Sequence, residues 1–282
     1  MKLASLGLIL IALALSGRAS AQVTRIEPVG GTLVVAVPVQ DGLVTCSDKR
    51  LFNETTGTYR DDFVKIHKVG NNALFVATNT TGFLDNTTGK MEFDVFEIAA
   101  HYASEHEFAP SRPFWEGLRK EIRDQLSKYL AKRKYDDWPA TDIANNKLLF
   151  NLVFYSIAGT SIRSHSMSVF YEKAPTPVIY VPDVVSEDVR TPKLLGKGKI
   201  VMSYLAVNPA LTRDPSILRF SQGNFDVSKT TTEEAVNFAE KLFLLTNKAL
   251  PGARVSETYD CALLSFQKGF QWIDDSGKAA VR

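Results

Sequence analysis

The stretch GGTLVVAVPVQDGLVTCSDKR, residues 30–50, constrains the fold more than any other part of the chain. Two β-branched runs in it flank Asp41-Gly42, a dipeptide typical of two-residue hairpin loops. A second pair of β-branched runs follows around Gly70-Asn71-Asn72. The first quarter of the chain is therefore expected to be β-structure, with strands at residues 32–39, 43–46, 63–69 and 73–78.

Helical periodicity follows, and strands then return. Apolar residues recur at helical spacing in 94–105 and 112–133, which predicts two amphipathic helices. Thr230 and Glu233 form a capping box in front of a helix that ends near residue 248. A short helix is expected at 200–206, and further strands at 147–157, 167–171, 178–181, 259–266 and 270–273.

This order of elements indicates the fold class. Strands grouped before and after a helical pair favour packed sheets with helices outside, over a parallel sheet with alternating helices. A chain of 282 residues that is 45% hydrophobic can build a large core. We therefore predict the α+β class.

The N-terminus has the pattern of a secretory signal. Lys2 precedes an apolar run at residues 6–16, and Ala19-Ser20-Ala21 supplies small residues for cleavage. Residues 1–21 are thus predicted to be a signal peptide of a secreted or periplasmic protein. No later segment reaches the ~18 uncharged residues of a membrane span, so no membrane contact is expected after signal cleavage.

The charges are nearly balanced. Lys and Arg together number 33, and Asp and Glu together number 31. Since Lys2 and Arg18 belong to the predicted signal, the net charge of the mature chain is near zero. Basic residues of the 112–133 helix alternate with acidic ones, which is typical of a solvated face. Nucleic acid is therefore not expected as a partner.

Cys46 and Cys261 are the cysteines of the chain. Export through an oxidising compartment permits one disulfide between them. Sequence does not fix the Cα separation that a bridge requires, so two buried thiols on strands are the alternative.

The histidines do not predict a metal site. His101 and His106 are five residues apart, on different helix faces, and no third ligand stands out. Ordinary polar contacts are expected for these two and for His67 and His165, with no metal and no cofactor.

Two parts of the chain resemble a known family. Residues 30–50, followed by FVKIHKVGNNALFVATNTTG, resemble the start of proteasome-type β subunits, which are N-terminal nucleophile (Ntn) hydrolases. TTTEEAVNFAEKLF and YDCALLSFQKGFQWI resemble that family's last helix and closing hairpin. The resemblance covers roughly residues 30–80 and 195–275 and implies a four-layer αββα sandwich.

In that family a propeptide is cut between glycine and threonine, which implies a cut at Gly31-Thr32. Residues 22–31 would be the propeptide, 32–275 the Ntn-hydrolase-like domain and 276–282 a tail. The freed Thr32 hydroxyl would attack an amide carbonyl with its own α-amine as general base. Such an amine suits this role because it titrates near ~7.7–8.

The family's other site residues match nearby positions. Its carboxylate and lysine fall on Asp48 and Lys65, and its arginine falls on Arg50, expected to be a structural charge partner. Lys65 would ease deprotonation of the Thr32 hydroxyl, and Asp48 would hold Lys65 in place. The backbone N–H that serves as oxyanion donor falls on Asn79, where the family has glycine.

Two hypotheses remain at this point. The first is an exported threonine peptidase or amidase that processes itself and cleaves peptides or small amides. The second is an inactive proteasome-like module for assembly or binding, in which Thr32 is a strand residue and Asp48 and Lys65 form a buried ion pair. Residues 196–199 and 252–257 depart from the family's serine-containing loops.

Proteasome-type subunits generally stack into rings, so the resemblance also implies a possible homo-oligomer.

Overall fold

The computed structural model describes residues 26–53, 56–85, 88–131, 147–172, 178–220, 223–249 and 255–280. The predicted signal peptide, 1–21, and the first part of the predicted propeptide, 22–25, lie outside these residues. Among the helices described, none is both long and apolar enough to cross a membrane.

The smaller sheet contains the hairpin of residues 33–48. Its five strands are antiparallel to their neighbours. Val39 pairs with Gly42, so the hairpin loop is Gln40-Asp41, one residue earlier than the predicted Asp41-Gly42. In spatial order the strands are β13 (Lys193–Gly196), β2 (Leu33–Val39), β3 (Gly42–Asp48), β14 (Tyr259–Ser265) and β15 (Gly269–Ile273).

The larger sheet has ten strands within the described residues. Its main path runs β11 (Val178–Tyr180), β10 (Ser161–Glu172), β9 (Lys147–Ala158), β7 (Ala73–Asp85), β1 (Ile26–Gly30), β4 (Leu51–Asn53) and β5 (Tyr59–Arg60). Off this path, β12 (Val185–Asp188) pairs with β10, and β6 (Ile66–Val69) and β8 (Met91–Asp94) pair with β7.

Two features of the larger sheet differ from the sequence prediction. β7 continues past Thr78 to Asp85, because its extension gains partners in β1 and β8. β1 was not predicted as a strand, and it occupies the second half of the predicted propeptide, up to Gly30.

Several of the helices begin at side-chain caps. Asp94 accepts a hydrogen bond from the backbone N–H of Phe96 (2.8 Å) at the start of α2 (Val95–Glu105). Before α8 (Thr232–Ala249) the capping box is Thr231 with Glu234 rather than the predicted Thr230 with Glu233. The remaining helices are α3 (Arg112–Ala131), α5 (Gly198–Ala206), α6 (Pro209–Thr212), α7 (Pro215–Leu218) and the 3₁₀ turn η2 (Val227–Lys229).

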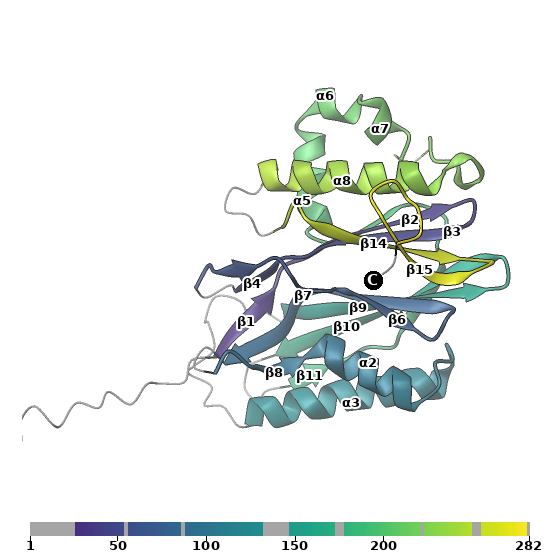
Figure 1. Ribbon diagram of the computed structural model, residues 1–282. Helices are drawn as coiled ribbons and strands as arrows, with labels where there is room; N and C mark the ends of the chain where they lie inside the picture. Colours follow the sequence, from purple (N-terminus) through teal and green to yellow (C-terminus); the bar gives the residue numbers. More distant parts are fainter. Residues whose placement is uncertain are drawn as a thin grey trace, which may run out of the picture.

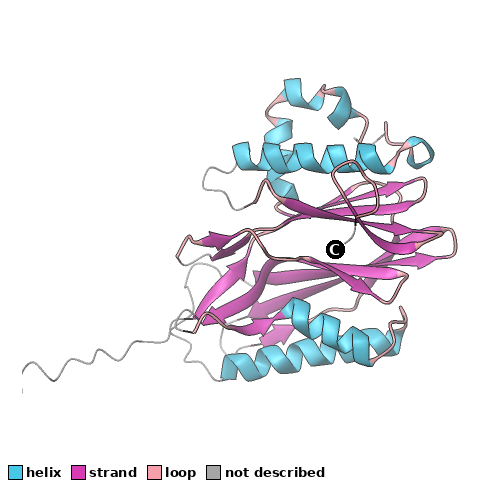
Figure 2. Cartoon of the chain, viewed as in Figure 1, coloured by secondary structure: helices cyan, strands magenta, loops and turns pink. Residues whose placement is uncertain are grey.

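The sheets face each other, and helices cover their outer faces (Figures 1 and 2). One apolar cluster joins the larger sheet to α2 and α3, and another joins the smaller sheet to α5 and α8. A third cluster lies between the sheets and includes Val34, Ala36 and Leu74. The predicted mixture of helices and sheets is therefore confirmed at this level.

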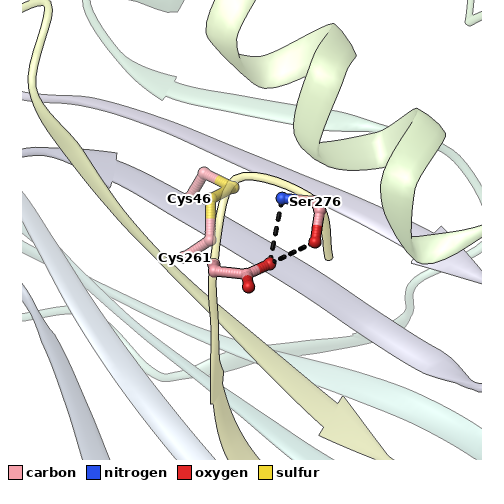
Figure 3. Close-up of a disulfide and its surroundings, with 4 residues drawn as sticks. Cys46, Cys261 and Ser276 are labelled. Atoms are coloured by element: carbon pink, nitrogen blue, oxygen red, sulfur yellow. Dashed lines mark hydrogen bonds between the residues drawn. A yellow bond between two sulfur atoms is a disulfide. The ribbon is translucent and has the colours of Figure 1, made fainter. Parts of the chain in front are cut away.

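Cys46 and Cys261 lie opposite each other on β3 and β14 and are joined by a disulfide (Figure 3). Both sulfur-bearing side chains belong to the cluster under α8. Beside the bridge, the turn after β15 is held by Ser276, whose N–H and hydroxyl donate to Asp274 (2.9 and 2.7 Å). The residues predicted as a tail thus begin in a turn that folds back on β15, where Ala279 bridges Ile273.

The disulfide links residues 215 positions apart, so removing it should considerably increase the conformational entropy of the unfolded chain. We predict that Cys46→Ala combined with Cys261→Ala lowers the free energy of unfolding by about 2–5 kcal/mol. Urea unfolding measures this change. The wild-type protein, unfolded by urea in the presence of dithiothreitol, should have the same unfolding midpoint as the double variant. An unfolding midpoint that dithiothreitol leaves unchanged would contradict the prediction.

Candidate functional site

The predicted cut site lies where the chain crosses from one sheet to the other. β1 belongs to the larger sheet and β2 to the smaller, and Gly31-Thr32 is the link between them. Gly31 has φ 79°, which glycine adopts without strain. Thr32 is 1% exposed, and its carbonyl accepts a hydrogen bond from the N–H of Lys197 (2.9 Å).

Two side chains converge on the carbonyl oxygen of Gly31. The ammonium of Lys65 donates to it at 2.9 Å, and the hydroxyl of Thr32 donates at 2.8 Å. Both side chains are buried. The peptide bond predicted to be cut is therefore contacted by the predicted nucleophile and by the predicted cation.

Lys65 makes three hydrogen bonds. Besides the Gly31 carbonyl, it donates to Asp48 Oδ2 (3.0 Å) and to the backbone carbonyl of Arg50. An ammonium has three donors, so this set satisfies its charged form. Burial lowers the pKa of Lys65, and the charge of Asp48 opposes that effect.

Asp48 is held by backbone donors as well as by Lys65. Its Oδ1 accepts from the N–H of Leu33 (2.8 Å), and its Oδ2 accepts from the N–H groups of Arg50 (3.1 Å) and Ser256 (3.5 Å). Burial raises the pKa of Asp48, while Lys65 and the N–H donors act against the rise. The carboxylate thereby ties the start of β2 to the end of β3 and to the segment before β14.

Arg50 has a charge partner that the sequence did not indicate. Its guanidinium forms a bidentate pair with Asp61 (2.7 and 2.5 Å) and lies over the ring of Tyr59 at 3.8 Å. This pair holds the pKa of Asp61 below its usual range. Arg50 contacts the Asp48–Lys65 pair through its backbone, while its side chain fixes the following loop.

Asn79 lies against the glycines that precede Thr32. Its carbonyl accepts from the N–H of Gly31 (3.1 Å), and a Cβ at Gly30 would lie 1.8 Å from that oxygen. Among the described residues, Asn79 is the single non-glycine residue with positive φ, 74°. This is the conformation that glycine favours and asparagine tolerates. The oxyanion role of its N–H stays a prediction.

The segments that depart from the family pattern reach the site through their backbones. At Gly196, φ 66°, a Cβ would lie 2.0 Å from the Thr32 carbonyl oxygen. Ser256 is 1% exposed and donates to Asp48, and its hydroxyl is 2.6 Å from that of Thr258. The sequence did not predict that Ser256 and Asp61 belong to the site. For Ser256, the one available signal was the serine in the family's closing loop. Residues 252–254 lie outside the described residues.

The histidines make ordinary contacts away from this site. His101 pairs with Glu105, His106 with the Tyr102 carbonyl, and His67 with the Val64 carbonyl. Buried His165 lies between the hydroxyls of Ser156 (3.0 Å) and Ser186 (2.8 Å). Within the described ranges, no group of three His, Cys, Asp or Glu side chains could hold a metal ion.

Comparison with known proteins gives structural likeness alone. No protein-family model matches, and no curated protein matches. A glycine variant, Anbu (Gly-1), from Hyphomicrobium sp. strain MC1 is 14% identical, with a TM-score of 0.48 over 89% of this chain and 85% of its own. Anbu, an ancestral beta-subunit, from Yersinia bercovieri is also 14% identical, with a TM-score of 0.49 over 88% and 84%. Likeness at this level assigns no activity to the chain.

The buried ion pair should be strongly coupled in stability. In a Thr32→Ala background, Asp48→Asn or Lys65→Met is each predicted to cost about 3–5 kcal/mol, because either change leaves a charge buried without its partner. Asp48→Asn combined with Lys65→Met should cost less than the sum of the single variants. Urea unfolding of all four proteins closes the cycle, and additive losses would contradict a paired site.

His165 should make stability depend on pH. Burial lowers its pKa to about 4, whereas an unfolded histidine titrates near ~6.5. The unfolded chain therefore binds more protons between these values, so stability is lost as pH falls from ~6.5 toward ~4. His165→Gln should flatten this dependence by at most about 1.4 kcal/mol per pH unit. The control is His101→Gln, an exposed position, which should keep the wild-type slope; equal slopes in both variants would refute the prediction.

Proposed function

We propose that this chain is a self-processing threonine peptidase or amidase of the proteasome-like Ntn-hydrolase type. The observation that carries the proposal is the convergence of Lys65 Nζ and Thr32 Oγ1 on the Gly31 carbonyl, at 2.9 and 2.8 Å. An ammonium at a carbonyl oxygen stabilises the negative charge that builds there during attack. The αββα sandwich is part of the proposal, supported by the helical layers outside the two sheets.

Self-cleavage would proceed as an acyl shift followed by hydrolysis. Thr32 Oγ1 attacks the carbonyl carbon of Gly31, and the oxyanion is stabilised by Lys65. The C–N bond then breaks, the Thr32 nitrogen gains the hydroxyl proton, and Gly31 becomes esterified to Oγ1. Water hydrolyses the ester, which leaves a carboxylate on Gly31 and an amine and a hydroxyl on Thr32.

The cleaved chain has the groups for repeated amide hydrolysis. Loss of Gly31 removes one acceptor from Lys65, whose N–H can then stabilise an alkoxide at Thr32. The new α-amine titrates near ~7.7–8 and can accept the hydroxyl proton. Attack on a substrate amide forms an acyl-enzyme at Oγ1 and releases the amine product, and water completes the turnover.

The position of β1 supports an extended peptide as substrate. β1 lies between β4 and β7, with Gly30 opposite Phe52 on one side and Thr80 on the other. Release of residues 22–31 would expose two strand edges, which bind extended chains through backbone hydrogen bonds. Small peptides fit better than folded proteins, because an exported enzyme has no nucleotide for an unfoldase.

Export remains part of the proposal. The N-terminal pattern of residues 1–21 predicts it, and the Cys46–Cys261 bridge supports an oxidising compartment. A homo-oligomer is proposed from the resemblance to proteasome-type subunits.

A second candidate function is an unprocessed assembly or binding module. It is favoured by the complete hydrogen bonding of Lys65 in the uncut chain and by the Asn79 carbonyl, rather than its N–H, facing Gly31. In that case the Asp48–Lys65 pair would only join the two sheets. The state of the Gly31–Thr32 bond distinguishes the two functions.

Replacing the nucleophile should stop processing. Thr32→Ala is expected to keep residues N-terminal to position 32 and to lose amidase activity on small peptide amides, because the attacking hydroxyl is gone. Thr32→Ser is the matched control and should be cut at the same bond, since it retains a hydroxyl. Intact-mass spectrometry and peptide-amide hydrolysis measure both; cutting in Thr32→Ala, or a wild-type protein that stays uncut, would contradict the proposal.

A further inference from the structure

A buried hydroxyl next to the candidate site has no partner. Thr78 is 0% exposed, and its Oγ1 makes no hydrogen bond within the described part of the chain. An unsatisfied buried hydroxyl destabilises the folded state. A valine of the same shape would avoid this cost, as Val76 does two residues earlier in the same inter-sheet cluster.

Thr78 and Thr32 are both neighbours of Gly196. Thr78 precedes Asn79 on β7, and Gly196 separates it from Thr32. A Cβ at Gly196 would lie 2.0 Å from the Thr32 carbonyl oxygen and 3.2 Å from Thr78 Cβ. Thr32 and Thr78 therefore both lie directly beside Gly196, where there is no room for a side chain.

The chemistry at Thr32 changes when the chain is cut. In the uncut chain the Thr32 nitrogen is a peptide amide with one N–H, whereas after cleavage it is an amine with additional N–H donors. The freed amine needs acceptors that hold it beside its own hydroxyl. The 196–199 turn, Gly-Lys-Gly-Lys, has no hydroxyl side chain that could serve this purpose.

We propose that Thr78 is a positioning residue whose Oγ1 accepts a hydrogen bond from the Thr32 amine of the cleaved chain, directly or through one water. This inference rests on the proposed function. In the uncut chain the hydroxyl has no partner among the described residues, and cleavage supplies the donor. It orients the amine, which acts as the general base, and does not touch the substrate.

The chain offers a matched control in Thr45. This residue on β3 is also 0% exposed with an unpartnered Oγ1, and it lies opposite Ala36 and Ala262 within the smaller sheet. Thr45→Val and Thr78→Val make the same chemical change in buried strands. A general effect of removing a buried hydroxyl should change both variants in the same way. A specific role toward the Thr32 amine should change the activity of Thr78→Val alone.

The first measurement is thermal unfolding of the uncut chain in a Thr32→Ala background. Thr78→Val and Thr45→Val are both expected to keep or raise Tm, because each removes an unsatisfied polar group. A lowered Tm in Thr78→Val but not in Thr45→Val would mean that the hydroxyl is already bonded before cleavage, and would overturn the proposal.

The second measurement is steady-state hydrolysis of a peptide amide by the processed enzymes across pH. Thr78→Val should lower kcat about tenfold, the equivalent of one hydrogen bond, and should change KM less than about twofold. It should also shift the acidic limb of the pH profile of kcat/KM, which reports the general base. Thr78→Ser should restore both, and Thr45→Val should match the wild type. If the wild type is processed and active and Thr78→Val has the same kcat and pH profile, this inference alone is overturned. If the wild type stays uncut, the inference is overturned together with the proposed function.

Discussion

The structure depends on one buried ion pair at the crossing between two sheets. Asp48 and Lys65 are fully buried, and charges so placed are tolerated when hydrogen bonds satisfy their atoms. The chain supplies these bonds largely from backbone groups of separate segments, including Gly31, Leu33 and Ser256. The same contacts that make the pair tolerable fix the position of the Gly31–Thr32 peptide, so stability and candidate chemistry share one set of atoms.

Close backbone approach is the second condition for this site. Gly30 and Gly31 let the chain pass directly against Asn79, and Gly196 lets β13 approach the Thr32 carbonyl. A side chain at Gly30 or Gly196 would collide with backbone atoms, which do not yield. Packing at Gly30 and the positive φ of Gly31 thus explain the Gly-Gly sequence before Thr32 whether or not the bond is cut. Cutting would add a change of partner for Lys65, from the Gly31 carbonyl to the Thr32 hydroxyl.

Local patterns predicted much of this arrangement, and long-range pairings account for the rest. The hairpin of residues 32–48 and the amphipathic helices followed from periodicity and turn residues. β1 could not be predicted, because IEPVG contains Pro and Gly and becomes a strand only between β4 and β7. The grouping of Thr32, Asp48 and Lys65 came from the family resemblance. The Arg50–Asp61 pair and the Ser256 contact had no sequence signal of comparable strength, because loop conformations that local patterns do not determine bring these residues together.

A crystal structure of the purified, exported protein would test the central claim most directly. The proposed chemistry predicts a chain that begins at Thr32, with no bond to Gly31, and with Lys65 Nζ at hydrogen-bond distance from Thr32 Oγ1. Continuous electron density through the Gly31–Thr32 peptide, with Lys65 still on the Gly31 carbonyl, would contradict it and leave a buried ion pair that only joins two sheets.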